Sequence, residues 1–304
     1  MKKRLKHLLT LKAWSKEEIL GIISLAEKIK KNPKNYKKEL DGKTLLMMFA
    51  KPSLRTYLSF DIAMHQLGGH AIFYDISHST LGKKESIKDF SKVVSRYVNV
   101  IVARLYEHKQ IEELARYSDV PVINGLTNDY HPCQVLGDLL TIKEKFKSLK
   151  NIKIVYFGDA NNNVTHSLII LSNKIGLDMY ICCPNKKEFL PNKRIIGNIK
   201  YNYEKEPKKA VHNASVIYTD SWMSYQIPKS QEKRRLKILK PYQVTKDIIK
   251  YSKENSIFMH CLPAHRGEEV TDEIMDSEKS VIYNQAENRL HTEKAILLKL
   301  LKKA

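Results

Sequence analysis

A chain of 304 residues, 42% of them hydrophobic, is long and apolar enough to fold as one large domain or two medium ones without disulfides. The composition excludes a disordered protein, and no apolar run approaches the roughly 20 residues that a transmembrane helix needs. The formal net charge of +20 is compatible with nucleic acid, an anionic surface or an anionic substrate as partner. The basic residues are interspersed with acidic ones, as on solvated helix faces, so we disfavour nucleic acid.

The N-terminus and the cysteines indicate a cytoplasmic protein without membrane attachment. The first residues, "MKKRLKHLLTLKAW", are basic, but Lys12 interrupts their apolar part and no small-residue cleavage site follows. We therefore interpret them as mature sequence. Four cysteines, two of them adjacent, are too few for a disulfide framework and fit a reducing compartment.

Helical and strand-like patterns alternate along the chain. Residues 15–30 have apolar side chains at helical spacing, and Ser15 followed by Glu18 is a capping pattern. Short apolar runs predict strands at 44–50, 71–75, 98–103, 121–124, 152–157, 178–183, 215–219, 256–260 and 280–283. The segments between most of these runs predict helices at 55–67, 85–96, 109–117, 134–147, 163–175, 230–240, 245–252 and 285–302.

This alternation predicts an α/β fold with two doubly wound domains, each with a central parallel sheet flanked by helices. Nine strands would be many for one sheet, so we expect a domain boundary near residue 150, at the polar segment "KSLKN". The expected first domain spans 1–150 and includes a C-terminal helix, 285–304, that packs back on it. The expected second domain spans 151–284.

Ligands in such folds bind beyond the carboxyl ends of the strands. In "MMFAKPSLRTYLSF", Pro52 stops a buried strand and Ser53 can cap the following helix. The first N–H groups of that helix form an anion site, to which Arg55 adds a planar fork and Thr56 a hydroxyl. An ordinary N-cap with a surface arginine is an equally compatible reading of this segment alone.

Two segments resemble nucleotide-binding loops but lack glycines that those loops require. "DGKT" at 41–44 lacks the glycine that a P-loop needs at position 37, which is Lys37. "FGDANNN" at 157–163 lacks the second and third glycines of a dinucleotide fingerprint. We therefore reject a P-loop and disfavour nicotinamide binding.

Further polar residues follow the next strands of the first domain. Arg104 follows the run 98–103, although a single arginine at a strand end is usually a surface residue. In "NGLTNDYHPCQ", His131 and Gln134 could polarise a carbonyl and bind an amide group. A helix-capping loop with a satisfied histidine is equally compatible with this segment.

The segment "HCLPAHRGEEV" raises two further possibilities. His260, Cys261 and His265 suggest metal, but only Cys133 or His131 could complete a zinc site, so we disfavour one. A cysteine nucleophile is possible at Cys261. Adjacent residues on a strand face opposite ways, however, which places His260 badly as its base.

Three further residues complete the set of candidate site residues. Asn163 begins a helix, Asp220 in "TDSWMSY" follows a strand, and Arg289 lies at the start of the last helix. Positive groups suited to a phosphate in the first domain thus contrast with a mixed set in the second, suited to an amine with a carboxylate.

Taken together, these motifs resemble the aspartate/ornithine carbamoyltransferase family. "KPSLRT", "HPCQVLGDLLTIKE", "GDANNN", "HCLPAHRGEEV" and "NQAENRLHTEKA" occur in family order and spacing from about Leu5 to the C-terminus, and the last three resemble the ornithine-specific branch. The resemblance implies transfer of the carbamoyl group of carbamoyl phosphate to the side-chain amine of ornithine, giving citrulline and phosphate in arginine metabolism. It also implies a homotrimer with active sites between subunits, and neither metal nor cofactor.

The resemblance further implies residue roles. Carbamoyl phosphate would be bound by Ser53, Leu54, Arg55, Thr56, Thr80, Arg104, His131, Gln134, Leu262 and Arg289, with Thr80 reaching a neighbouring subunit's site. Ornithine would be bound by Asn163, Asp220, Ser224, Tyr225 and Cys261. The catalytic set would be Arg104, His131, Cys261 and Arg289. Leu54 replaces a usual threonine at a position that contributes mainly its backbone N–H.

One departure from the family pattern concerns the acceptor. In "DSWMSYQIPKS", Tyr225 and Gln226 replace the Met-Gly of the family's Asp-x-x-x-Ser-Met-Gly, which removes a flexible glycine and adds bulk. A related amine such as putrescine or lysine is therefore an alternative acceptor. We favour ornithine, because Asp220 and Asn163 suit an α-amino acid head. A basic α/β nucleic-acid-binding protein is a distant alternative.

Overall fold

The computed structural model describes residues 5–77, 85–223 and 227–302 of the chain. The chain divides into two compact units, one formed by 1–140 and 287–304 and the other by 141–286. Both divisions fall inside helices, α5 (Pro132–Phe146) and α12 (Ile282–Leu301), whereas the sequence pattern places the boundary in the linker after α5. We call 1–140 with 287–304 the N-unit and 141–286 the C-unit.

The N-unit contains a four-stranded parallel sheet in the order β2-β1-β3-β4. The strands are β1 (Thr44–Phe49), β2 (His70–Asp75), β3 (Val100–Arg104) and β4 (Val122–Leu126). The helices are α1 (Lys16–Lys31), η1 (Pro33–Tyr36), α2 (Leu54–Gln66), α3 (Ile87–Val94), α4 (His108–Tyr117) and most of α12. Every residue of β3 is buried, as expected for a central parallel strand that is covered on both faces.

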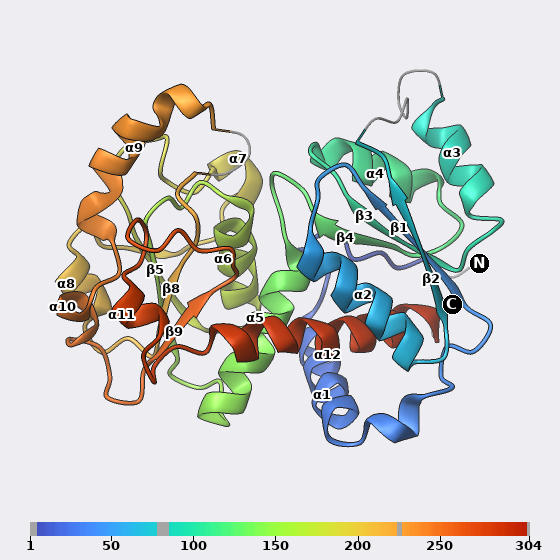
Figure 1. Cartoon of the computed structure of the whole chain (residues 1–304), viewed down its shortest axis with the longest axis horizontal. Coiled ribbons are helices and arrows are strands. Elements are labelled where there is room, and N and C mark those ends of the chain that lie inside the picture. The colour runs from blue at the N-terminus through green and yellow to red at the C-terminus, as the bar shows by residue number, and fades with distance from the viewer. Residues whose placement is uncertain (1–4, 78–84, 224–226, 303–304) are drawn as a thin grey trace. The chain divides into compact units, whose positions relative to one another are not determined.

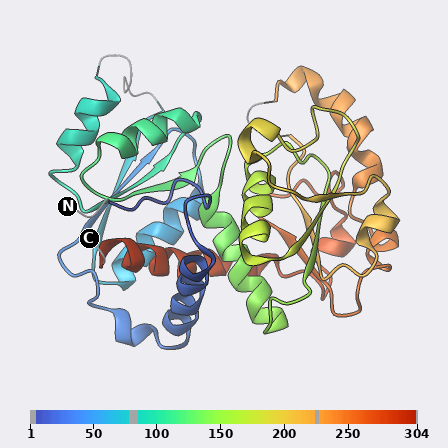
Figure 2. The same ribbon diagram turned by 180° about the vertical axis from the view of Figure 1, so that it is seen from behind.

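Helices cover both faces of this sheet. Figures 1 and 2 show α3 and α4 on one face and α1, α2 and α12 on the other. On the first face, Ile87 of α3 and Ile111 of α4 share a buried cluster with Met48 and Ile101. The expected capping box of α1 is present, since the Ser15 hydroxyl accepts from the Glu18 N–H at 3.2 Å and the Glu18 carboxylate accepts from the Ser15 N–H at 3.0 Å.

The C-unit contains a five-stranded parallel sheet in the order β7-β6-β5-β8-β9. Its strands are β5 (Lys153–Phe157), β6 (Asp178–Cys182), β7 (Asn202–Tyr203), β8 (Val216–Thr219) and β9 (Ile257–His260). Its helices are α6 (Asn163–Ile175), α7 (Lys193–Ile196), α8 (Pro207–Val211), η2 (Lys229–Gln231), α9 (Glu232–Leu239), η3 (Lys240–Tyr242), α10 (Lys246–Ile249) and α11 (Asp272–Met275). Val155 of β5, Ile217 of β8 and Phe258 of the edge strand β9 pack against α8, α10 and α11.

The expected fold class is confirmed. Both sheets are parallel and flanked by helices, and residues 287–304 of the C-terminal segment belong to the N-unit. The polar contacts of α12 include a hydrogen bond at 2.8 Å from Lys30 Nζ of α1 to Asn288 Oδ1 and one from Lys294 Nζ to Gln66 of α2. The last helix therefore packs on the first unit, as expected.

One expected strand is wrong. Residues 280–283 do not form a strand, because Ser280 makes only an isolated bridge to Phe258 and α12 begins at Ile282. Val281 and Ile282 are buried, so a short apolar run here marks the start of a helix rather than a strand. Periodicity alone does not separate the two over so few residues. The two-residue strand β7 was too short to be predicted.

Among the described residues, the helices include none with both the length and the apolar character required to cross a membrane.

Candidate functional site

The end of β1 leads into a helix start whose free backbone N–H groups could bind an anion. Ser53 is the N-cap of α2, and its hydroxyl accepts from the Thr56 N–H at 3.3 Å and donates to Thr56 Oγ1 at 3.0 Å. The first turn of α2 contains no acidic residue, so nothing offsets the positive end of its dipole. The Leu54 side chain is 70% exposed, which fits a position that contributes its backbone N–H.

Two buried arginines join this helix start. Arg104 ends β3 and is paired in register with Phe49, the last residue of β1. Arg289 of α12 donates to Thr56 Oγ1 and to Gln134 Oε1, both at 3.2 Å. The structure therefore brings together three residues that the sequence pattern places on three separate helices.

Close approach of α5 to α12 makes this convergence possible. A Cβ atom on Gly137 of α5 would lie 3.4 Å from the Arg289 backbone nitrogen and 3.6 Å from its Cδ atom. A Cβ atom would therefore fit in ordinary van der Waals contact, whereas a larger side chain at Gly137 would push against Arg289.

Two buried carboxylates orient these groups, and sequence reasoning missed both. Glu293 accepts from Arg289 Nε at 3.1 Å and from Nη2 at 2.8 Å. Asp138 accepts from Gln134 Nε2 at 2.9 Å. Burial raises the pKa of Glu293, while Arg289 opposes the rise. Their position one helical turn beyond Arg289 and Gln134 is the signal that could have identified them.

His131 is a neutral imidazole at physiological pH. Its pKa is lowered well below the usual value, first by burial and then by the charges of Arg289, Arg104 and Arg55. The shared effect of these three arginines shows that they lie in one electrostatic environment. A neutral imidazole can donate a hydrogen bond to a carbonyl without adding a charge.

Lys51 is a further cation that sequence reasoning passed over. Its ammonium donates to Asn128 Oδ1 and lies 4.3 Å from the centre of the Tyr106 ring. Burial and then Arg104 lower the pKa of Lys51 to about 8. The available signal was its place two residues beyond β1, at the carboxyl end of the sheet where ligands bind. Lys51 adds to a cationic surrounding that suits a phosphate dianion.

The C-unit contributes a second set, which begins at the turn after β5. Asn162 is the N-cap of α6, and its side-chain oxygen accepts from the Thr165 N–H at 2.8 Å. Asn163 is therefore the first helical residue, at the carboxyl end of the sheet. Gly158 has φ +99°, and a Cβ there would lie 2.3 Å from Trp222 Nε1, so only glycine fits.

Asp220 and Cys261 meet at the ends of neighbouring strands. β8 and β9 pair with Thr219 opposite His260, so the next residue of each strand lies side by side. The Cys261 thiol donates to Asp220 Oδ1 at 3.1 Å, and the Ser221 N–H donates to the same oxygen at 2.8 Å. Burial raises the pKa of Asp220, and the hydrogen bonds from Cys261 and the Ser221 N–H oppose the rise. A carboxylate beside a thiol can orient an amine.

His260 serves the loop that follows β9. Its Nδ1 accepts from the Leu262 N–H at 2.9 Å, so the proton is on Nε2, which donates to Glu269 Oε1 at 3.2 Å. Both groups are fully buried. His260 is therefore unavailable as a base for Cys261, as the strand alternation predicts.

The same engagement argues against metal. Ligand atoms of Asp220, His260 and Cys261 lie within 4.8 Å of one another. A metal ion would have to displace the Leu262 N–H or the Glu269 carboxylate from His260. The hydrogen bond from the Leu262 N–H to Nδ1 therefore disfavours a metal ion at these three residues.

The remaining expected residues are placed as follows. Leu262 lies in the C-unit with φ +59°, and the peptide bond to Pro263 is cis. The expected residues Thr80, Ser224 and Tyr225 lie outside the described residues. The structure thus brings Thr56, Gln134 and Arg289 together in the N-unit, and Asp220 with Cys261 in the C-unit.

Comparison with known proteins matches both halves of the chain. Residues 6–144 match the family model "Aspartate/ornithine carbamoyltransferase, carbamoyl-P binding domain", and residues 150–300 match "Aspartate/ornithine carbamoyltransferase, Asp/Orn binding domain". Together these two models span nearly the whole chain.

Curated relatives and solved structures agree with the family models. The chain is 47% identical to ornithine carbamoyltransferase from Methanocaldococcus jannaschii, over 95% of this chain and 97% of that protein. It is also 47% identical to "Ornithine carbamoyltransferase, anabolic" from Pyrococcus furiosus, over 96% of this chain and 95% of that protein. The solved P. furiosus ornithine carbamoyltransferase superposes with a TM-score of 0.92 at 45% identity, covering 98% of each chain. The structure of ornithine transcarbamoylase from Giardia lamblia gives a TM-score of 0.91 at 38% identity, covering 99% and 100%.

Proposed function

We infer the roles of the two residue sets from one premise, that this chain belongs to the aspartate/ornithine carbamoyltransferase family. It transfers the carbamoyl group of carbamoyl phosphate to the side-chain amine of ornithine, giving citrulline and phosphate. The observation that best supports the roles below is the convergence of Thr56, Gln134 and Arg289 on one point of the N-unit.

The N-unit binds the carbamoyl donor. The phosphate group is held by the start of α2, through Ser53, the Leu54 N–H, Arg55 and Thr56, and by Arg104 from β3. Supporting this, the helix start is free of acidic residues and lies near buried cations. Thr80, which lies outside the described residues, is expected to contribute from a neighbouring subunit.

The carbamoyl carbonyl is polarised by Arg289, His131 and Thr56. Each such donor contributes about 3–4 kcal/mol when it is aimed at the developing oxyanion. The carbamoyl nitrogen is bound by Gln134 and the Leu262 carbonyl. Holding both substrates in reactive geometry supplies roughly 7–11 kcal/mol more.

The C-unit binds the acceptor. Asn163 and Asp220 hold the α-amino and carboxylate groups, and Asp220 with Cys261 orients the δ-amine. Ser224 and Tyr225, which lie outside the described residues, are expected to contribute to binding of the acceptor. The neutral amine attacks the carbamoyl carbon and the C–N bond forms. The C–O bond to phosphate then breaks, phosphate leaves with the bonding electrons, and the amine proton is lost to it or to solvent.

We expect kcat/KM for ornithine to rise about tenfold per pH unit between pH 7 and 9. The reacting amine resembles that of lysine, with a pKa near 10.4, so its neutral fraction grows tenfold per unit below that value. His131, whose pKa is lowered, stays neutral across this range and adds no opposing titration. Citrulline release at saturating carbamoyl phosphate measures the slope, and a flat profile would contradict it.

An acceptor panel tests the proposed specificity. Ornithine, lysine, putrescine, N-acetylornithine and aspartate are compared at equal concentration by release of phosphate. We expect turnover with ornithine to exceed every other acceptor by at least about 100-fold, because buried polar groups reject a ligand that leaves them unpaired. Equal turnover of putrescine would show that the α-amino acid head is not recognised.

A homotrimer is the proposed assembly. β2 is an edge strand, and its Ile72, Phe73 and Tyr74 are all between 43% and 46% exposed. An exposed apolar edge strand is a surface that proteins normally cover. Light scattering should give three times 35.3 kDa, about 106 kDa.

Variants on this edge test the proposed assembly. Ile72→Lys should lower the mass toward that of the monomer, because a charge opposes burial of the edge. Tyr97→Lys, at an exposed tyrosine outside β2, is the matched control and should leave the mass unchanged. A trimer with normal stability in Ile72→Lys would show that β2 is not the interface.

We place the reaction in arginine biosynthesis in the cytoplasm. The support is that one relative at 47% identity is described as anabolic, together with the cysteine usage expected of a reducing compartment.

A further inference from the structure

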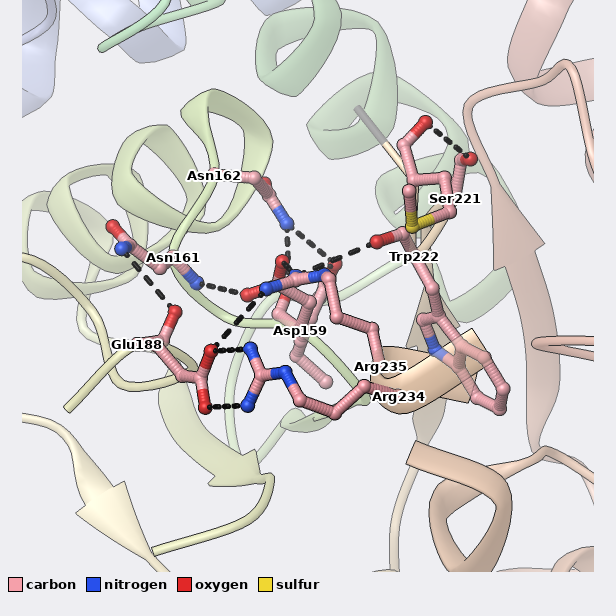
Figure 3. A network of polar contacts seen from close by, with 10 residues as sticks. Asp159, Asn161, Asn162, Glu188, Ser221, Trp222, Arg234 and Arg235 are labelled. Carbon is pink, nitrogen blue, oxygen red and sulfur yellow. Dashed lines mark hydrogen bonds and ion pairs between the residues drawn. The ribbon is translucent and has the colours of Figure 1, made fainter. Parts of the chain in front are cut away.

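A buried ion pair lies behind the acceptor residues of the C-unit. Figure 3 shows Arg235 of α9 and Asp159 of the β5–α6 turn pointing toward each other. The guanidinium donates to Asp159 Oδ2, and the two side chains are only 4% and 7% exposed. Arg235 also lies over the Phe189 ring, 4.8 Å from its centre. None of these contacts has a role in the chemistry described above.

Asp159 organises the turn that leads to Asn163. Its other carboxylate oxygen accepts from the Asn161 N–H at 3.0 Å. Its backbone carbonyl accepts from the Asn162 side chain at 2.7 Å and from the Tyr156 hydroxyl at 3.0 Å. Asn162 in turn caps α6. The position of Asn163, the first residue of α6, thus depends on the orientation of Asp159.

Arg235 also reaches the segment that contains Asp220. Its guanidinium lies 3.5 Å from the backbone carbonyl of Trp222, two residues beyond Asp220. The Trp222 indole is buried and packs directly on Gly158, beside Asp159. One guanidinium therefore contacts both the turn after β5 and the segment after β8.

The charges around Asp159 favour its pairing with Arg235. Burial raises the pKa of Asp159 to about 6, and Arg235 is the largest influence that opposes the rise, while Asp220 adds to it. Two carboxylates within electrostatic reach of each other destabilise each other's charge. Arg235 compensates the negative charge next to the residue that receives the cationic groups of the acceptor. Glu188, 3.8 Å from Arg235, is mainly paired with the exposed Arg234.

We propose that Arg235 is a positioning residue for the acceptor amino acid, which holds the segments of Asn163 and Asp220 in register through Asp159 and the Trp222 carbonyl. It does not touch the substrate. This inference rests on the proposed acceptor role of the C-unit, and it assigns the affinity for ornithine partly to a residue on α9.

The test compares Arg235→Met with Arg234→Met. Methionine keeps the length and the packing on Phe189 but removes the charge. We expect Arg235→Met to raise KM for ornithine by about 10- to 100-fold, the loss typical of a small misplacement of binding groups. KM for carbamoyl phosphate should change less than twofold. Arg234→Met, which removes the same charge one residue away on the exposed side of α9, should change neither constant.

Further variants separate positioning from a merely structural role. Arg235→Lys retains the charge and should recover part of the ornithine affinity. The double variant Asp159→Asn/Arg235→Met should raise KM for ornithine no more than Arg235→Met alone, because both residues act through one contact. Wild-type citrulline release tests the proposed function, and the ratio of variant to wild-type KM tests the inference.

Two results would overturn the inference. One is a lower melting temperature and fewer active sites in Arg235→Met with both KM values unchanged. The other is additive effects of the two substitutions in the double variant.

Discussion

Replacing Arg55 by alanine is expected to weaken carbamoyl phosphate binding by about 10²–10³-fold, because truncating one partner of a desolvated charge pair costs about 2–5 kcal/mol. Arg55 is the second residue of α2, and its charge is among those that lower the pKa of His131. Its planar fork can contact two phosphate oxygens at once, which neither a hydroxyl nor a backbone N–H replaces. Titration calorimetry with carbamoyl phosphate measures the loss.

The control removes an equal charge from the same unit. Arg116 is exposed in the last turn of α4, so Arg116→Ala should leave the affinity within twofold of wild type. The N-cap hydrogen bonds of Ser53 do not involve the Arg55 side chain, so α2 should still form in Arg55→Ala. Unchanged affinity in a folded Arg55→Ala protein would refute the role of this helix start.

Replacing Asp220 by asparagine is expected to lower kcat/KM for ornithine by about 10³-fold, because the change leaves acceptor cations next to an uncharged group. Asparagine has nearly the same shape, and its side-chain oxygen can still accept from the Ser221 N–H and the Cys261 thiol. The loss should therefore reflect charge rather than misfolding. Citrulline release at varied ornithine measures it.

Two further measurements locate the effect. The affinity for carbamoyl phosphate should stay within twofold in Asp220→Asn, because that substrate is bound by the N-unit. Asp247 is an exposed aspartate of α10 that pairs with Lys250. Asp247→Asn removes the same charge from the surface and should leave kcat/KM for ornithine unchanged. Full activity in Asp220→Asn would show that this carboxylate does not bind the acceptor.

Much of the fold could be predicted from the chain alone. After Thr44, the run "LLMMF" of β1 is apolar and buried because both faces of a central parallel strand are covered, and apolar runs located eight of the nine strands that the structure describes. The signal failed where it was shortest, at 280–283 and at β7, since a few residues do not establish a period. Residues beyond strand ends, such as Ser53 and Asp220, could be proposed as site residues because ligands bind there in doubly wound sheets.

The sequence by itself determined which side chains stand at the ends of strands and which backbone caps begin the helices, because these depend on neighbours in the chain. Only the tertiary structure decided which of them meet. Arg289 contacts Thr56 across 233 positions, and Arg235 contacts Asp159 across 76. Chain order does not say that β8 pairs with β9. This pairing places Asp220 next to Cys261. The neutral His131 and the low-pKa Lys51 likewise follow from burial among other cations, a property that exists only once distant segments have packed together.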